Sequence, residues 1–287
     1  MSTLRTTPKH EDLIYDVGLN CGQDTDFYLK KGYRVVAFEA EPRNVELCRE
    51  RFADAIADGR LIIVEGAITE TPLARGDDRT ARFFRNEGHS PWGSTSEEWA
   101  QRNTIFGTEM EAIEVKAVDF AEAMAEHGIP HYLKADIVGS EVICLRAMLD
   151  FENKPDYLSI RSEKLIFAKL EYEFDLLEEL GYTSFKAVKQ DFERIRETLP
   201  DQLHLYEFED GASGPFGEHT LGRWATREAV LKYYRRVFTK YWLFGDYSYM
   251  IQTAKGRKFI STLERIFRRS IPGWYDTHAR HISLDRK

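Results

Sequence analysis

The stretch IYDVGLNCGQDTDFYLKKGYRVVAFEAEPRN, residues 14–44, decides the fold. An apolar run contains Asp16 and stops at Gly18, which predicts a strand followed by a turn. A predicted helix over residues 24–31 comes next, and RVVAFEAEP is typical of a buried strand. Glu39 stands near the end of this second strand, 23 positions after Asp16. Strand, glycine turn, helix, strand and acid in this order predict a nucleoside-cofactor site.

The same alternation continues as far as residue 180. Further strands are predicted at 60–68, 112–117, 131–136 and 155–162, and further helices at 43–58, 119–127, 140–149 and 163–180. Residues 69–110 are predicted as a loop. Alternating strands and helices predict an α/β fold, with a largely parallel sheet covered by helices on both faces. We therefore expect a cofactor-binding core over residues 1–190 and a C-terminal extension over 191–287, packed on the same domain.

Composition argues against several classes of protein. The longest apolar runs fall far short of the roughly 20 residues that cross a bilayer, and the first residues, MSTLRTTPKHEDL, lack the apolar segment of a secretory signal. Three cysteines lie far apart, without the spacing of a zinc site or the density of a disulfide scaffold. A net charge of −8 argues against broad attraction to nucleic acid. We expect a cytoplasmic protein with reduced cysteines.

The acid before the glycines bears on which cofactor the turn holds. The motif from Asp16 to Gly22 is not GxGxxG, and an acidic residue before its glycines would repel the pyrophosphate of a dinucleotide. S-adenosylmethionine has no phosphate and carries a sulfonium and an ammonium, so Asp16 favours it over NAD. Alternatively, Gly18 and Gly22 only allow a tight turn and Glu39 is a solvated strand-end acid. The order of the elements favours the cofactor site.

With these motifs the sequence resembles the FkbM-type methyltransferases, a branch of the class I S-adenosylmethionine-dependent enzymes. The resemblance covers about residues 13–180. YDVGLNCG is similar to the family's first cofactor motif, and VVAFEAEP to its second strand with the ribose-binding acid. The segments in the expected later places are GAI, EGHSPWGST, IEVKAVDFAEAMAEHGIPHYLKADIVGSE and PDYLSIRSE.

The resemblance implies a Rossmann-like sheet and transfer of a methyl group to a hydroxyl of a small molecule, commonly a sugar or a secondary metabolite. It implies cofactor contacts from Asp16, Gly18, Asn20, Gly22, Glu39, Gly66 and Ala67. It also places Asp136 at the end of the fourth strand of the fold, near the sulfonium and the acceptor.

Two positions depart from the family's pattern. Members of the family usually have an acid two residues after this aspartate, where the chain has Val138. Arg161 stands where a neutral or acidic residue is expected. The changes remove one negative charge and add one positive charge at the acceptor end of the sheet, which indicates altered specificity or weakened catalysis.

Three side chains are candidates for the chemistry at the acceptor end. A hydroxyl acceptor benefits from a base that takes its proton, and Asp136 or His89 could supply it. Asp136 could equally cap the helix that begins near Ser140, and His89 could be an exposed loop residue. Glu163 could bind the acceptor or pair with Arg161. Carboxylates and histidines could also hold a metal, but no tight ligand motif is present, and we predict no obligatory metal.

Residues 191–287 differ in character from the core. HLYEFEDGASGPFGEHTLGRW is rich in glycine and aromatic residues, and we expect an acceptor cap in which Phe216, His219 and Trp224 contact a sugar; packing on the core is the alternative. REAVLKYYRRVFTKYW is predicted as an amphipathic helix with basic residues among its aromatic ones, and KGRKFISTLERIFRRS adds another basic stretch. Such a helix could contact a nucleic acid or an anionic membrane. A solvated basic face opposite a packed aromatic stripe is the favoured interpretation, and the acidic total charge supports it. We therefore expect neither a nucleic acid nor a membrane as partner, and the aromatic helix is compatible with a homo-oligomer.

The leading prediction is an S-adenosylmethionine-dependent O-methyltransferase that acts on a sugar or another polyhydroxylated metabolite. A catalytically weakened binding protein of the same fold is the first alternative, because of Val138 and Arg161. An NAD-dependent oxidoreductase is the second, and Asp16 and the absence of GxGxxG count against it.

Overall fold

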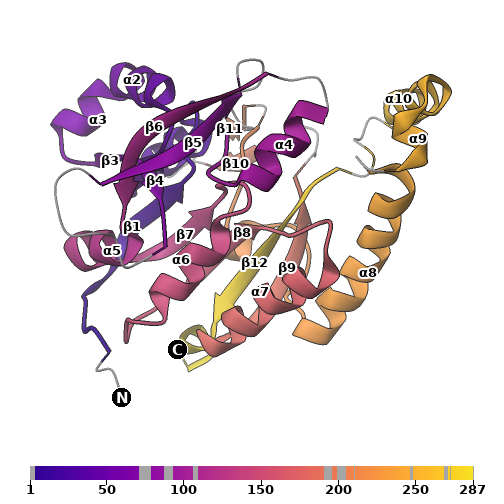
Figure 1. Ribbon diagram of the computed structural model, residues 1–287. Coiled ribbons are helices and arrows are strands. Elements are labelled where there is room, and N and C mark those ends of the chain that lie inside the picture. Colours follow the sequence, from indigo (N-terminus) through magenta and orange to yellow (C-terminus); the bar gives the residue numbers. More distant parts are fainter. Residues whose placement is uncertain are drawn as a thin grey trace.

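The computed structural model describes most of the chain: residues 4–70, 79–86, 93–105, 109–190, 196–198, 205–209, 211–245, 248–267, 271 and 273–286. Residues 275–281, near the C-terminal end, form a strand of the same central sheet as residues 9–17 (Figure 1).

A seven-stranded sheet forms the centre of the molecule, in the order β3-β2-β1-β7-β8-β12-β9. Its strands are β1 (Lys9–Val17), β2 (Arg34–Glu39), β3 (Leu61–Glu65), β7 (Ile129–Ala135), β8 (Tyr157–Arg161), β9 (Tyr182–Lys189) and β12 (Tyr275–His281). The pairs from β3 to β8 are parallel, and β12 lies antiparallel between β8 and β9. The prediction of a largely parallel α/β sheet is confirmed.

Helices cover both faces of this sheet. One hydrophobic cluster joins the sheet to α5 (Phe120–His127), α6 (Glu141–Met148), α7 (Phe167–Glu179) and α8 (Arg227–Phe244). A second cluster lies on the other face with α1 (Gln23–Lys30), α2 (Pro42–Arg51) and α3 (Ala53–Ala57). Strands β2 and β7 and the second half of β1 are almost continuously buried, as expected for a parallel sheet with helices on both sides.

The region predicted as a loop, residues 69–110, contains regular structure. A smaller sheet in the order β4-β6-β5 is formed by β4 (Ala67–Ile68), β5 (Thr80–Asn86) and β6 (Met110–Val118), and α4 (Glu97–Ile105) follows β5 in the chain. The loop prediction was therefore wrong. The strand predicted at 112–117 forms, but in this smaller sheet, because β6 pairs with the short β4 that leaves the main sheet after β3.

The C-terminal region contributes to several parts of the molecule. It contains the β10 (Arg196–Thr198) and β11 (Leu205–Glu207) hairpin, α8, and the helices α9 (Tyr249–Gln252) and α10 (Ala254–Phe267) beyond the end of α8 (Figure 1). Phe216 stacks on Tyr132 with ring centroids 4.2 Å apart, and Trp224 stacks on Tyr157. Both aromatic residues therefore pack against the sheet, which is the alternative to the predicted sugar contacts.

Candidate functional site

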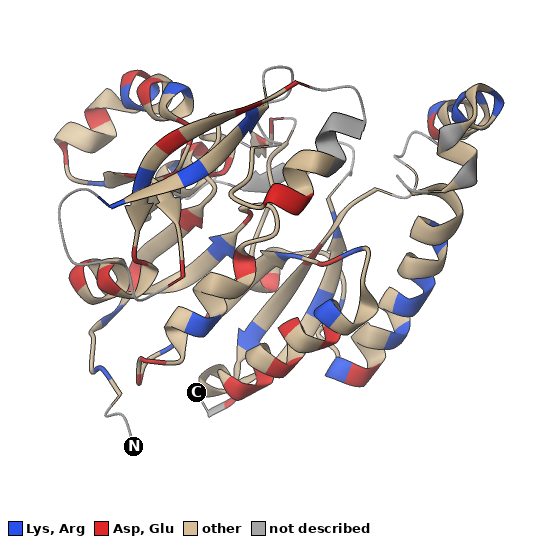
Figure 2. Ribbon diagram, viewed as in Figure 1, with Lys and Arg blue, Asp and Glu red and all other residues tan. Residues whose placement is uncertain are grey.

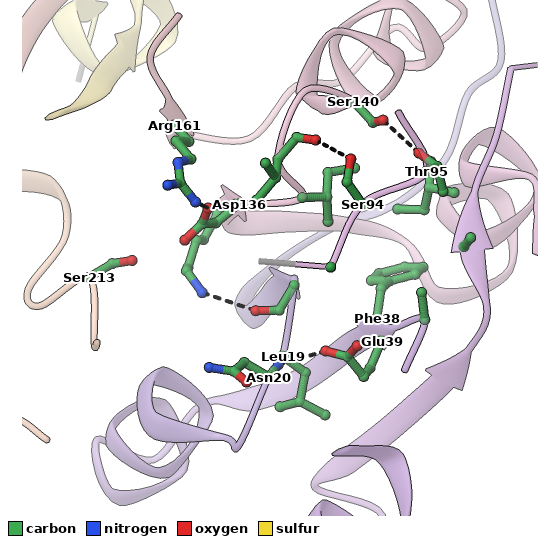
Figure 3. A pocket seen from close by; sticks show the side chains of 18 of the residues that line it. Leu19, Asn20, Phe38, Glu39, Ser94, Thr95, Asp136, Ser140, Arg161 and Ser213 are labelled. Carbon is green, nitrogen blue, oxygen red and sulfur yellow. Dashed lines mark hydrogen bonds and ion pairs between the residues drawn. The ribbon is translucent and has the colours of Figure 1, made fainter. Parts of the chain in front are cut away.

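A cavity of about 640 Å³ opens at the carboxyl ends of the parallel strands, where the strand order reverses between β1 and β7. Such a switch point is the usual ligand site of an open α/β sheet. Figure 3 shows side chains from β2, from the end of β8, from the segment after β7 and from neighbouring loops around this space. The predicted site residues that line it are Gly18, Asn20, Glu39, Gly66, Ala67 and Asp136.

Gly18 allows two loops to touch at the floor of the cavity. Its φ is +94°, and a Cβ atom at this position would lie 2.2 Å from the carbonyl oxygen of Asp136. Both the backbone conformation and the space therefore require glycine. This close approach brings the turn after β1 against the loop after β7, so the two ends of the switch point form one wall.

Asp16 lies behind the cavity and does not line it. The side chain is fully buried, with Oδ1 2.9 Å from Lys134 Nζ and Oδ2 accepting a hydrogen bond from the Thr25 hydroxyl at 2.7 Å. Lys134 Nζ also lies 3.0 Å from Asp24 Oδ2. Burial opposes the charge on Lys134, but these two carboxylates outweigh it and raise the pKa of the amine well above its usual value. Asp16 thus fixes a buried cation between β1, β7 and α1.

Asp24 connects this buried group to the C-terminal region. Its carboxylate accepts a hydrogen bond from the backbone N–H of Ser213, at 2.8 Å to Oδ1. Ser213 and the preceding Gly211 and Ala212 line the cavity. Residues 211–213 of the C-terminal region therefore lie at the cavity, and Phe216 is not part of its lining.

Glu39 is the buried acid at the end of β2. Its Oε2 accepts a hydrogen bond from the Asn20 N–H at 2.7 Å, and its Oε1 accepts one from the Glu41 N–H at 2.8 Å (Figure 3). Burial raises the pKa of Glu39 to about 7 despite these hydrogen bonds. The residue lines the cavity with remaining lone pairs that can accept hydrogen bonds from a ligand.

Gly22 does not line the larger cavity; it allows close packing of the helices beside it. It precedes α1 with a φ of +82°, and a Cβ atom there would lie 2.4 Å from the Phe52 ring. Gly22 therefore lets α1 begin directly over α2 and α3. Because Gly22 is not among the residues that line the cavity, its contact with a cofactor stays a prediction.

Asp136 follows β7 and is paired with Arg161 at the end of β8. Arg161 Nη1 lies 3.2 Å from Asp136 Oδ1, and both side chains line the cavity (Figure 3). The predicted pairing of Arg161 with Glu163 is not the one observed; Arg161 instead neutralises the candidate base.

Val138 adopts a backbone conformation that is rare for its type. Its φ is +36°, which is strongly disfavoured for a β-branched residue. The Ser94 hydroxyl donates to its carbonyl oxygen at 2.8 Å, and Thr95 and Ser140 form a second hydrogen bond between the same two loops at 2.9 Å (Figure 3). These bonds hold the strained turn in place against the segment that precedes α4, between β5 and β6 of the smaller sheet.

A second cavity of about 280 Å³ adjoins the first. The lining residues that the two cavities share are Trp99, Val138, Arg161, Lys164 and Trp274. Trp274 immediately precedes β12, so the strand from the C-terminal region positions part of the common wall. The two cavities therefore lie next to each other, and these five shared residues form the wall between them.

Glu141 lines the second cavity and is not among the catalytic candidates predicted from the sequence. It is buried, its Oε2 accepts a hydrogen bond from the Gly139 N–H at 2.9 Å, and its Oε1 has no hydrogen-bond partner among the residues that the structure describes. Burial raises the pKa of Glu141 to about 7. A buried carboxyl group with a free oxygen and a pKa near neutrality has the properties of a general base.

The remaining candidates differ in position. Glu163 lines the second cavity, but its Oε1 already accepts hydrogen bonds from the N–H groups of Lys164, Leu165 and Ile166. His89 lies outside the described residues. Within the described ranges, no cluster of three or more histidine, cysteine, aspartate or glutamate side chains is arranged to hold a metal ion.

Solved structures with similar arrangements include several methyltransferases. An FkbM methyltransferase from Methylobacillus flagellatus KT is 18% identical, with 63% of this chain and 40% of that chain covered and a TM-score of 0.37. An S-adenosylmethionine-dependent O-methyltransferase from Thermotoga maritima is 10% identical, with 95% and 60% covered and a TM-score of 0.38. These similarities are too low to transfer a substrate. Comparison with curated protein sequences finds no match.

The family comparison is more specific than the structural ones. The model of the methyltransferase FkbM domain matches residues 16–208, which is more than half of the chain and includes every strand that forms the cavity except β12 and the start of β1. The resemblance in the glycine turn and in the acid after β2 is thus part of a match across the core. The chain belongs to the FkbM family of S-adenosylmethionine-dependent methyltransferases.

Proposed function

We infer that the protein transfers a methyl group to a hydroxyl of a small polyhydroxylated metabolite, such as a sugar. The observation that carries this proposal is the pair of adjoining cavities: one has the features of a nucleoside site, and the other contains a buried carboxyl group with a free oxygen.

The larger cavity fits S-adenosylmethionine in its chemistry. Glu39 offers carboxylate oxygens for the two ribose hydroxyls, and Phe38, Ile68 and Phe83 supply apolar surface for a purine ring. Gly18 keeps the floor free of a side chain. Asp16 belongs to the support beneath this floor through Lys134, which replaces the direct contact expected from the sequence.

The smaller cavity is the acceptor site in this proposal. When bound, S-adenosylmethionine supplies a methyl group on a sulfonium; transfer forms an O–C bond, breaks the C–S bond with its electron pair returning to sulfur, and releases the hydroxyl proton. In this proposal the carboxyl group of Glu141 accepts that proton, because the residue lines the smaller cavity and burial raises its pKa to about 7. Arg161 lines both cavities and orients the acceptor, and Asp136, which lines the larger cavity, holds Arg161 in place through their ion pair.

Calorimetric titration tests the cofactor part of the proposal. S-adenosylmethionine and S-adenosylhomocysteine should each bind saturably to the purified protein, and NAD should give no heat. Incubation with methyl-labelled S-adenosylmethionine and a panel of sugars and polyols should then give an alkali-stable labelled ether. Binding of NAD alone would contradict the cofactor assignment, and label only on an amine or a carboxylate would contradict O-methylation of a hydroxyl.

A catalytically weakened form is the second candidate, and the ion pair of Arg161 with Asp136 favours it. Val138→Glu restores the acid that the family usually has at this position. A large gain in transfer rate would support a weakened enzyme, whereas an unchanged or lower rate in a folded variant would support an active site that works with valine. Val138→Gln is the control, because it has the same size as glutamate without the charge.

A further inference from the structure

Helix α10 has an apolar face that is left largely uncovered. Phe259, Leu263 and Ile266 follow one another at helical spacing, and Phe259 and Ile266 are 50% and 64% exposed. Ile260, on the neighbouring part of the helix, is buried. The side of α10 that contains Ile260 therefore packs on the protein, and the side that contains Phe259 and Ile266 faces outward.

Exposed cations surround this apolar face. Lys255, Lys258 and Arg265 of α10 are exposed and form no ion pair within the part of the chain that the structure describes. Residues 227–267 contain nine lysines and arginines against three aspartates and glutamates, a net charge of +6 in a chain whose total is −8. Figure 2 shows blue segments along α8 and α10 at one end of the molecule. Positive charge is thus concentrated on an otherwise acidic protein.

An exposed apolar face next to exposed cations favours some classes of binding partner over others. Single-stranded nucleic acid binds through cations and stacking aromatic rings, and it would gain nothing from an aliphatic side chain such as Ile266. A symmetric contact between two copies would place the same cations opposite one another, which is repulsive. A bilayer that contains anionic lipid meets both requirements, since headgroups pair with the cations and the acyl boundary receives the apolar face.

We propose that α10 and the adjoining end of α8 dock on the surface of a bilayer that contains anionic phospholipid. Phe259 and Ile266 enter the acyl boundary, and Lys255, Lys258 and Arg265 lie at the headgroups. Trp242, near the end of α8, is 77% exposed and is of a residue type enriched at this interface. This proposal differs from the sequence-based expectation that the protein has no membrane partner. It does not depend on the proposed methyl transfer.

Docking on the surface is distinct from crossing the bilayer. Over the described ranges, no helix has both the length and the apolar character needed for a membrane span. An interfacial helix needs only one apolar side, which α10 has.

Flotation of the full chain with vesicles tests the proposal. The protein should float with vesicles of equal parts phosphatidylcholine and phosphatidylglycerol, should stay behind with phosphatidylcholine alone, and should be released as salt screens the headgroups. Equal flotation with both vesicles, or flotation with neither, would overturn the proposal.

Paired variants locate the surface. Phe259→Ser with Ile266→Ser should abolish flotation, and Lys255→Gln with Lys258→Gln should lower partitioning by about fivefold for each charge removed. Leu47→Ser with Ile62→Ser is the matched control, because both residues are exposed apolar side chains on α2 and β3, and it should float like the native protein. Flotation unaffected by the α10 variants would place binding elsewhere, and a stable dimer that the Phe259 and Ile266 changes dissociate would make this face a contact between copies.

Discussion

Lys134 Nζ lies 2.9 Å from Asp16 Oδ1; Lys134 is buried in the wall of the larger cavity, and Asp16 is fully buried behind it. The pair joins β7 to β1 at the point where the strand order reverses. An ammonium between Asp16 and Asp24 thus takes the place of apolar packing at the centre of the site.

Lys134→Met should therefore be strongly destabilising. The change leaves two carboxylates buried without their cation, and the free energy of unfolding should fall by about 3–5 kcal/mol. Urea denaturation at neutral pH measures this loss. Lys169→Met is the control, because Lys169 forms an exposed pair with Glu98, and its effect should stay below about 0.5 kcal/mol. Similar losses in both variants would contradict a special role for the buried pair.

Gly18→Ala should damage both stability and cofactor binding. The added Cβ atom would meet the Asp136 carbonyl oxygen at 2.2 Å, and the two loops would have to separate. Gly32→Ala is a matched control, since Gly32 has a similar φ of +91° but no atom within 4 Å of its Cβ position. The control should lose only the cost of the left-handed conformation, about 1 kcal/mol, and should bind S-adenosylmethionine normally in calorimetry.

The affinity for S-adenosylmethionine should rise with pH through neutrality. Burial gives Glu39 a pKa of about 7 in the free protein, and its deprotonated form accepts stronger hydrogen bonds from ribose hydroxyls than the neutral acid. The dissociation constant should be about tenfold larger near pH 6 than near pH 8. Glu39→Gln should bind more weakly and should lose this pH dependence. A native affinity that stays constant across neutrality would argue that Glu39 does not hold the ribose.

Glu141→Gln should separate catalysis from cofactor binding. The transfer rate should fall roughly 100-fold, because the amide cannot take the acceptor proton, whereas the affinity for S-adenosylmethionine should be unchanged. The native rate should rise with pH up to about 7 and then level off, following the raised pKa of Glu141.

Glu98→Gln provides the comparison for this variant. Glu98 also lines the smaller cavity but is an exposed acid paired with Lys169. Its loss should leave the rate within about twofold of the native value. A Glu141→Gln enzyme with the native rate and pH profile would return the role of base to Asp136.

The sequence predicts those parts of the site whose positions follow from the order of strands and helices along the chain. Gly18, Glu39 and Asp136 each directly follow or end a strand, and parallel strands bring their carboxyl ends to one edge. The turn after β1 could therefore be placed near Glu39 from sequence alone. Lys134 offered a usable signal as well, because it is a charged residue inside an otherwise apolar strand.

The parts that the sequence does not predict depend on distant contacts. Ser213 reaches Asp24 across 189 positions, and Trp274 joins the wall only because the following strand enters the sheet. The orphaned oxygen of Glu141 is a matter of burial, which no spacing reveals. The positive φ of Val138 likewise arises from the loops that hold it, against the preference of valine itself.

The position of β12 has a consequence for how the protein is made. β9 ends at Lys189 and its partner β12 begins at Tyr275, so the facing edges of β8 and β9 stay unpaired while the ribosome synthesises the intervening residues. Exposed strand edges favour aggregation, and pairing over such a sequence distance is slow. Trp274 reaches the wall of both cavities only in this late step. A nascent chain released before residue 275 would therefore need protection by a chaperone, and the wall that Trp274 completes would form only after the last gap in the sheet closes.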